Sequence, residues 1–264
     1  MTITILAALP QEYAHFKRLT GRWRNVQAGP FKMSFILRSG IEIMLIETGM
    51  GKGPAMEALS AALGSCTPDL IISAGFAGSL CGAAQVGGVF LADRFELHSY
   101  DTEVECAESY LQDIPEKMRG FCARYGVGTI RVVTATRPEP KFAASNRWSD
   151  RPSLLDMESF YAARSAYPSK TPLLCFRAVS DGLEHEIDFD LGAITDSRGR
   201  VKIAAVAAAV LARPRLIKSF GMAWRRSSRA GRRLGEVLFS LLNLPAADLF
   251  ELVSGCVVRK EEME

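Results

Sequence analysis

Charged side chains accompany two short apolar runs that have the composition of buried strands. Glu12 comes just after the run at residues 2–8, while Arg177 and Asp181 lie within and just beyond the run at residues 172–179. Because open α/β sheets carry their sites at the carboxyl ends of strands, these groups are candidates for acid–base chemistry. The two acids also have plainer explanations, since a first-turn glutamate complements a helix dipole and an aspartate at a strand end often caps a helix.

A glycine-containing segment and a pair of acids add to these candidates. Residues 73–80 read Ser-Ala-Gly-Phe-Ala-Gly-Ser-Leu, where glycines let a backbone approach a ligand closely; an ordinary loop is the alternative. The spacing is not the Gly-x-Gly-x-x-Gly of dinucleotide folds. Asp156 and Glu158 flank Met157 at the start of a segment of helical composition. Capping accounts for one acid there, but a second acid facing an apolar wall is costly unless it binds something.

Alternating strand and helix patterns predict the scaffold that positions these residues. We expect strands at the apolar runs, which are residues 2–8, 31–37, 41–47, 69–74, 86–91, 129–134 and 172–179. We expect helices where helix formers predominate, at residues 10–19, 55–63 and 155–167. This alternation indicates an α/β sheet with both faces covered. We predict a catalytic domain over residues 1–190 and a helical, basic C-terminal extension over residues 191–264 that packs on or beside it.

Composition excludes several classes of protein. The chain has 264 residues, of which 48% are hydrophobic and 23% charged, so disorder, collagen-like repeats and coiled coil are excluded. The net charge of +3 is too small to indicate nucleic-acid binding. The six cysteines form no Cys-x-x-Cys and the three histidines have no metal-ligand spacing, so we expect neither a metal nor a cofactor. Buried free thiols are typical of a reducing cytoplasm, where we place the protein.

One stretch departs from this ordinary composition. Residues 213–233 contain eight Lys or Arg and no Asp or Glu. One interpretation is a surface helix with a solvated basic face. The other is an interfacial helix whose Phe220 and Trp224 enter lipid while arginines meet anionic headgroups, which predicts peripheral membrane contact through residues 213–240 on the inner face of the membrane. No recognised nucleic-acid module accompanies the stretch, so we expect no nucleic-acid partner.

Five motifs in order resemble the nucleoside phosphorylase/nucleosidase superfamily, and more closely its methylthioadenosine/S-adenosylhomocysteine nucleosidases. They are the strand and turn ending at Glu12, Gly49-Met-Gly-Lys52, Ala74-Gly-Phe-Ala-Gly78, Asp156-Met-Glu158 and Arg177-Ala-Val-Ser-Asp181. The resemblance implies a three-layer α/β/α domain around a twisted mixed sheet. It also implies a homodimer and a small-molecule nucleoside substrate.

The resemblance further assigns roles to these residues. Asp181 matches the general acid that protonates purine N7, which neutralises the leaving group as an oxocarbenium-like ribosyl cation forms. Glu12 matches the carboxylate that activates the attacking water, and Arg177 the residue that positions it. Glu158 matches the acid that binds the ribose hydroxyls, with Met157 against the sugar. Further substrate-binding positions follow from the same motifs: Gly75, Phe76, Ala77 and Ser180.

The nucleophile can be water or phosphate in this superfamily. Phosphorylases carry a Gly-Asp-Pro-type turn with an arginine after the first strand, where this chain has Leu9-Pro-Gln-Glu12, and an arginine before the second glycine segment, which is absent here. Without a cationic cradle a phosphate dianion has little to hold it, so we expect hydrolysis. A phosphorylase with an unrecognised phosphate site is one alternative. A non-catalytic nucleoside-binding or membrane-associated protein is another.

Two departures bear on the substrate. Phe76 stands where nucleosidases usually have a small hydroxyl residue, and the aromatic purine clamp is not recognisable in residues 134–145. A narrower resemblance accounts for both: Asp156-Met-Glu-Ser159, Asp190-Leu-Gly-Ala193 and the arginine-rich C-terminus are similar to the hopanoid-biosynthesis-associated phosphorylase-like proteins. That subfamily implies release of adenine from adenosylhopane, a 5′-substituted adenosine with a large apolar group.

Overall fold

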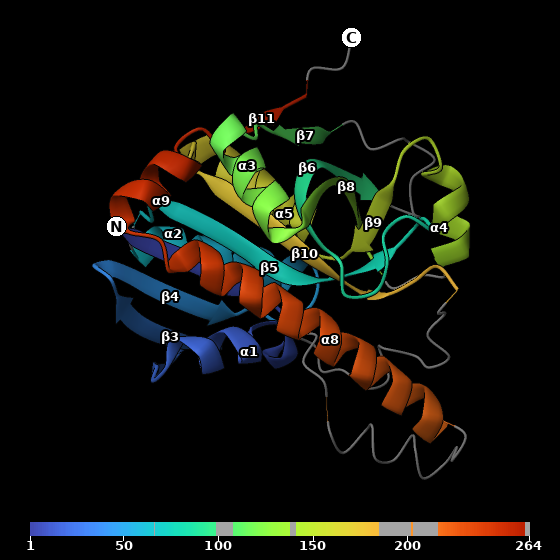
Figure 1. Cartoon of the computed structure of the whole chain (residues 1–264), viewed down its shortest axis with the longest axis horizontal. Helices are drawn as coiled ribbons and strands as arrows, with labels where there is room; N and C mark the ends of the chain where they lie inside the picture. The colour runs from blue at the N-terminus through green and yellow to red at the C-terminus, as the bar shows by residue number, and fades with distance from the viewer. Residues whose placement is uncertain (66, 99–107, 138–140, 185–201, 203–215, 262–264) are drawn as a thin grey trace.

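Apolar runs of the sequence form the strands of a mixed sheet in the computed structural model, which describes residues 1–65, 67–98, 108–137, 141–184, 202 and 216–261 (Figure 1). The strands are β1 (Thr2–Ala7), β2 (Arg24–Ala28), β3 (Phe31–Arg38), β4 (Ile41–Glu47), β5 (Leu70–Ser79), β6 (Val89–His98), β7 (Ser109–Gln112), β8 (Val127–Ala135), β9 (Ser153–Asp156), β10 (Leu173–Asp181) and β11 (Val258–Lys260). The helices are α1 (Pro10–Thr20), α2 (Lys52–Ser65), α3 (Glu116–Tyr125), α4 (Lys141–Arg147), α5 (Ser159–Ala166), α8 (Leu216–Leu242) and α9 (Ala246–Val253).

Strands β4, β1, β5 and β10 run parallel, so their carboxyl ends meet at one edge of the sheet. β1 lies between β4 and β5, and β10 pairs in parallel with β5. The register places Leu6 beside Ser73 and Arg177 beside Gly75. Because Glu12 follows β1 within the first turn of α1, it reaches the same edge, which is where open α/β sheets bind ligands.

Strand β10 also closes part of the sheet into a ring. It pairs antiparallel with β6, and β6, β8, β9 and β5 then pair in turn. This closure brings the end of β9 beside the ends of β5 and β10, where Asp156 meets Arg177. A register shift between Val179 and Asp181 makes the end of β10 irregular.

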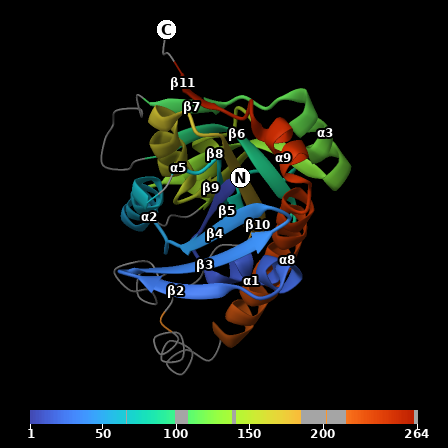
Figure 2. The same ribbon diagram turned by 90° about the vertical axis from the view of Figure 1, so that its left-hand side faces the viewer.

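Two hydrophobic clusters hold helices against the two faces of the sheet. Helices α1, α3, α8 and α9 share one cluster with strands such as β1 and β4, and α2 and α5 share the other (Figure 2). The arrangement is a three-layer α/β/α domain around a mixed sheet, as predicted. Within the described ranges, no helix is long and apolar enough to cross a membrane.

The C-terminal elements belong to the same core as the sheet. Ala230 and Leu234 of α8 are fully buried in the cluster that covers α1, and β11 pairs with β7 at the sheet edge. The part of α8 that precedes Ala230 instead exposes Met222 and Trp224. The domain boundary predicted at residue 190 lies outside the described residues.

Most predicted elements are confirmed to within a few residues, and three differ. The strand predicted over residues 69–74 is longer in the structure, where β5 continues to Ser79 because β10 and β9 pair with its last residues. The predicted helix at 155–167 starts only at Ser159, since Leu154 and Leu155 pair with β5 and β8 in β9. Strand β6 begins and ends later than residues 86–91. Elements that the sequence patterns did not predict are β2, β7, α3, α4, β9 and β11.

Candidate active site

Main-chain donors anchor Glu12 in the first turn of α1. Its Oε2 accepts the N–H groups of Ala8 and Leu9 at 2.7 and 2.8 Å. Its Oε1 accepts the N–H of Phe76 in β5 at 2.8 Å. A carboxylate offers about four lone-pair positions, so these donors leave about one for a further partner. Glu12 therefore satisfies the start of its own helix and retains accepting capacity.

Burial raises the pKa of Glu12 above its ordinary value. The residue is only 4% exposed, and desolvation outweighs the opposing hydrogen bonds from Leu9 and Phe76 and the charge of Arg177. A carboxylate with a raised pKa binds a proton more readily than an exposed glutamate. This property suits a group that takes a proton from water.

Arg177 is the largest fully buried side chain and is held at three points. Its Nε donates to Asp156 Oδ2 at 2.7 Å, and its Nη2 donates to Ser73 Oγ at 3.0 Å. Its Nη1 donates to the Phe176 carbonyl at 3.1 Å. These contacts use three of the five N–H donors of a guanidinium. The orientation of Arg177 is therefore fixed by groups from β5, β9 and β10.

Asp156 is the centre of this network. Its Oδ1 accepts the hydroxyl of Thr134 at 2.7 Å, and its Oδ2 accepts the hydroxyl of Ser159 at 2.5 Å as well as Arg177. A buried carboxylate is tolerated when it is paired and hydrogen-bonded in this way. Asp156 therefore holds Arg177 in place. The sequence patterns did not assign this role to Asp156; the available signal was Ser159, a hydroxyl residue three positions later.

Glu158 lies half-buried at the start of α5. Its Oε1 accepts the N–H of Gly51 at 2.7 Å, which links the predicted Gly49–Lys52 motif to the predicted Asp156–Glu158 motif. Burial, followed by the neighbouring charge of Asp156, raises the pKa of Glu158 to about 8. At neutral pH this side chain can therefore carry a proton and both donate and accept hydrogen bonds.

A small cavity joins four of the predicted site residues. Glu12, Gly75, Glu158 and Arg177 line it together with Ser73. Its volume is about 20 Å³, and roughly 10–15 Å³ of such volume holds one water molecule. The structure thus brings a carboxylate with spare accepting capacity and a guanidinium around a water-sized space.

Gly75 makes this close approach possible. A Cβ added there would lie 3.1 Å from Glu12 Oε1 and 3.2 Å from Arg177 Nη1. The ring of Phe76 is directed at α8, because a Cβ added to Gly231 would lie 3.3 Å from its Cζ. Since the main-chain N–H of Phe76 still bonds Glu12, the polar contact at this position does not depend on the side chain.

Asp181 lies in a second cluster at the end of β10. Its Oδ1 accepts the hydroxyl of Ser180 at 2.5 Å, and its Oδ2 accepts the ammonium of Lys141 from α4. The Ser180 hydroxyl also lies 3.5 Å from the Ala77 carbonyl. Asp181 is four residues beyond Arg177, about 13 Å along an extended strand.

The predicted site residues therefore fall into two groups. The remaining ones do not line the water-sized cavity: Met157, Phe76, Ala77, Ser180 and Asp181. Met157 is half-buried and Ala77 is buried. Local sequence patterns do not predict the role of Lys141, because its contact with Asp181 joins positions 40 residues apart.

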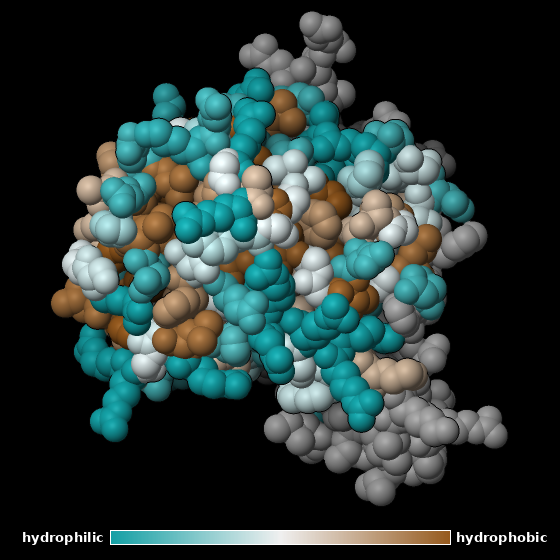
Figure 3. Space-filling model, in the orientation of Figure 1, coloured by the Kyte–Doolittle hydropathy of each residue, from teal (hydrophilic) through white to brown (hydrophobic). Residues whose placement is uncertain are grey.

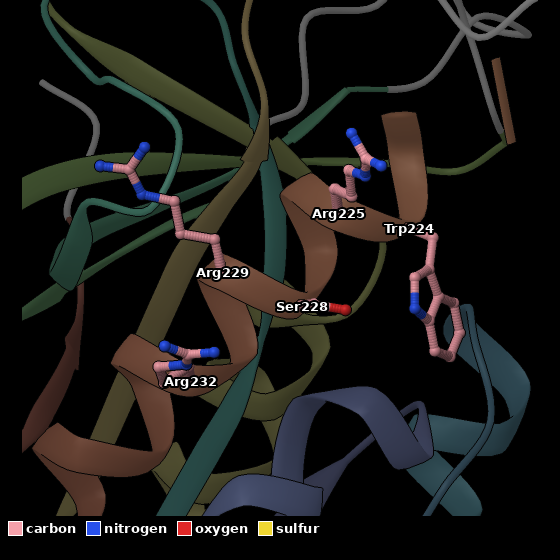
Figure 4. A pocket seen from close by; sticks show the side chains of 5 residues that line it. All are labelled: Trp224, Arg225, Ser228, Arg229 and Arg232. Carbon is pink, nitrogen blue, oxygen red and sulfur yellow. The ribbon is translucent and has the colours of Figure 1, made fainter. Parts of the chain in front are cut away.

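A second hollow lies away from this site, on the exposed half of α8. Its lining is Trp224, Arg225, Ser228, Arg229 and Arg232 (Figure 4). Figure 4 shows the Trp224 indole and the Arg229 guanidinium pointing away from each other with Ser228 between them. Hydrophilic side chains gather along α8 across the face seen in Figure 3. The hollow is cationic, with one large exposed aromatic ring.

Comparison with known proteins gives the family. Residues 2–214 match the Phosphorylase superfamily, and the chain belongs to this family. Curated relatives point to the nucleosidase branch. The 5′-methylthioadenosine/S-adenosylhomocysteine nucleosidase of Lysinibacillus sphaericus (strain C3-41) is 23% identical over 209 residues, which cover 72% of this chain and 91% of that protein.

Solved structures show the same fold. The futalosine hydrolase of Helicobacter pylori strain 26695 has a TM-score of 0.68 at 12% identity, covering 92% of this chain and 97% of that chain. The 5′-methylthioadenosine/S-adenosylhomocysteine nucleosidase from S. pneumoniae has a TM-score of 0.64 at 19% identity, covering 92% and 99%. The predicted resemblance to the superfamily and its nucleosidases is confirmed.

Proposed function

We propose that the chain is an N-ribosyl hydrolase that releases adenine from a 5′-substituted adenosine. It is an enzyme of the N-glycosyl hydrolase class, like the nucleosidases that it resembles in sequence and fold. The observation that carries the proposal is the water-sized cavity between Glu12 and Arg177. Glu12 and Arg177 line this cavity together, and burial raises the pKa of Glu12. Both observations support assigning this pair to water activation.

The residues divide the reaction between two ends of the substrate. Asp181 donates a proton to purine N7 as the bond between C1′ and N9 breaks and its electron pair moves into the base. Glu158 binds the ribose hydroxyls, and Met157 packs against the sugar. Water held by Arg177 attacks C1′ and gives its proton to Glu12. General acid and general base catalysis contribute on the order of 10²–10⁴-fold each.

Phosphorolysis is the alternative reaction. Arg177 is the cation lining the cavity among the described residues, and three of its five donors already serve Asp156, Ser73 and a carbonyl. This single, already engaged cation favours hydrolysis.

One assay tests the proposal against its alternatives. Free adenine is measured after incubation with a panel of 5′-substituted adenosines, amphiphilic ones included, with and without phosphate. We expect phosphate-independent release in the wild type and a loss on the order of 10²-fold or more in Asp181→Asn. Release that requires phosphate would make the protein a phosphorylase. No release from any compound would indicate a non-catalytic nucleoside-binding protein, and a near wild-type rate in the variant would remove Asp181 as the acid.

For the 5′ substituent we propose the hopane group of adenosylhopane, as in hopanoid biosynthesis. The support is the narrower sequence resemblance, of which Asp190–Ala193 lies outside the described residues. The ring of Phe76 adds an apolar surface against α8. Adenine release from adenosylhopane and from methylthioadenosine at equal concentration tests this. Faster turnover of methylthioadenosine would contradict it.

We also propose peripheral membrane contact through α8, narrowed from residues 213–240 to the exposed part around residues 220–229 and Arg232. Trp224 is 60% exposed and Met222 53%, in a stretch without acidic residues. Each basic residue near an anionic surface contributes on the order of 1 kcal/mol. The residues of α8 from Ala230 onward that are buried in the core cannot contact a membrane.

Vesicle sedimentation tests this contact. Because α8 contributes core residues, deletion of the C-terminal region would disturb folding, so point variants are required. We expect replacement of Arg225, Arg229 and Arg232 by Ala to weaken binding to phosphatidylglycerol vesicles on the order of 100-fold, in a salt-sensitive manner. The matched control replaces three exposed cations elsewhere: Lys117, Arg259 and Lys260. An equal loss of vesicle binding in both variants would show that binding depends on net charge alone and not on α8.

Two further expectations accompany the proposal. We propose a homodimer in the cytoplasm, as the sequence resemblance and the free thiols suggest. Light scattering after size exclusion measures the mass in solution, and a monomer at assay concentration would contradict the dimer.

A further inference from the structure

Lys141 is a buried cation that the proposed mechanism does not use. Its side chain is 6% exposed, and its Nζ bonds Asp181 Oδ2 and the Gly182 carbonyl, the latter at 2.5 Å. It enters the cluster from the first residue of α4, 40 residues before its partner. The cation therefore occupies the oxygen of Asp181 that is not bonded to Ser180.

The surroundings of this ion pair are shaped around it. A Cβ added to Gly78 would lie 2.9 Å from Lys141 Cδ and 3.0 Å from Asp181 Oδ2. A side chain at position 78 would therefore displace the lysine stem, the carboxylate or both. Because Gly78 of β5 has no side chain, Lys141 can pass the strand there and reach the Asp181 carboxylate.

Proton supply gives this lysine a chemical role. Removing an ammonium from water is costly, and an apolar residue of similar length would fill the same space without that cost. An ammonium differs from an apolar group, and from a guanidinium, in that it can release a proton. The departing purine anion is a much stronger base than a carboxylate. It can therefore draw a proton through the carboxylate from a second proton source.

We propose that Lys141 supplies the proton that Asp181 delivers to the leaving purine, an inference that rests on the proposed function. As the bond from C1′ to N9 breaks, its electron pair stays with the purine. One proton passes from Lys141 Nζ to Asp181 Oδ2, and one passes from Asp181 to N7. The lysine becomes a neutral amine, and Asp181 ends as the carboxylate it was before. Water adds to C1′ and its proton passes to Glu12, after which solvent restores both groups.

Lys141 acts through Asp181, so its test must separate proton supply from positioning. Lys141→Met removes the charge and keeps the length. Lys141→Arg keeps the charge but does not release a proton at ordinary pH. Lys117→Met on exposed α3 is the matched control, since its ammonium pairs only with an exposed Glu251 in the described structure. Each variant is assayed on a 5′-substituted adenosine and on its N7-methylated cation, which needs no proton.

We expect both Lys141 variants to lower kcat for the unmethylated substrate on the order of 10²-fold, with KM changed less than about threefold. We expect the rate with the N7-methylated substrate and the control variant to stay within about threefold of wild type. A Lys141→Arg rate near wild type would make the lysine a positioning cation and overturn the proposal. Equal slowing of both substrates would also overturn it. A wild type that releases adenine from neither substrate would instead contradict the proposed function.

Discussion

Glu12 and Asp181 are both carboxylates at the edge where parallel strands end, but they are held by different kinds of groups. Three main-chain N–H groups bind Glu12. Two side chains, Ser180 and Lys141, bind Asp181. The proposed water end of the site is therefore determined by the path of the backbone. The proposed leaving-group end depends on side chains that a single substitution can replace.

The largest expected effect tests the backbone-held carboxylate. Glu12→Gln keeps the size but removes the base, so we expect kcat for adenine release to fall on the order of 10²–10⁴-fold. Because the pKa of Glu12 is raised, wild-type activity should fall on acidification at a higher pH than an ordinary glutamate would give. The pH profile of kcat/KM measures this. An acid limb near pH 4, or one that persists in Glu12→Gln, would assign the base elsewhere.

A smaller effect is expected where the main chain makes room for that carboxylate. Gly75→Ala places a Cβ 3.1 Å from Glu12 Oε1 and 3.2 Å from Arg177 Nη1, and both side chains are buried. We expect a loss of roughly tenfold in kcat, equivalent to about 1.4 kcal/mol. Gly53→Ala, where a Cβ meets open space, is the matched control. An unchanged rate in Gly75→Ala would show that the arrangement around Glu12 tolerates displacement.

The last prediction concerns stability rather than rate, at the carboxylate of Glu158. The pKa of Glu158 is raised to about 8, so its stabilising protonated form is fully present below about pH 4.5 and the contribution is lost as pH rises toward 8. Glu158→Gln avoids this loss. Because Glu158 is only half-buried, solvent screening reduces the linkage energy of this shift below its full value. We expect the variant to exceed the wild type by about 1–2 kcal/mol in free energy of unfolding at pH 7, and by little at pH 4. Urea unfolding at both pH values measures the difference; a pH-independent gap would contradict the shift.

The sequence patterns predicted the backbone-held half of the site better than the side-chain-held half. A β-branched run followed by Pro10 is a local signal, so β1, α1 and the position of Glu12 were predictable. Strand β10 was predictable for the same reason, since its apolar run is continuous apart from Arg177.

The features that the sequence patterns did not predict all depend on residues far away in the chain. Leu154 and Leu155 have helical as well as strand composition, and only pairing with β5 and β8 makes them a strand. The glycines of β5 leave an ordinary loop open as an alternative, whereas pairing with β10 keeps them extended. Lys141 meets Asp181 across 40 residues, which no local pattern encodes.

The packing of α8 on α1 determines when, during synthesis, the surroundings of Glu12 are completed. A Cβ added to Gly231 would collide with the carbonyl oxygen of Gln11, and one added to Gly235 would lie 2.7 Å from the N of Phe16. The wall beside Glu12 thus comes from residues about 220 positions later in the chain. Since synthesis proceeds from the N-terminus, Glu12, the proposed base, is translated long before the helix that completes its surroundings.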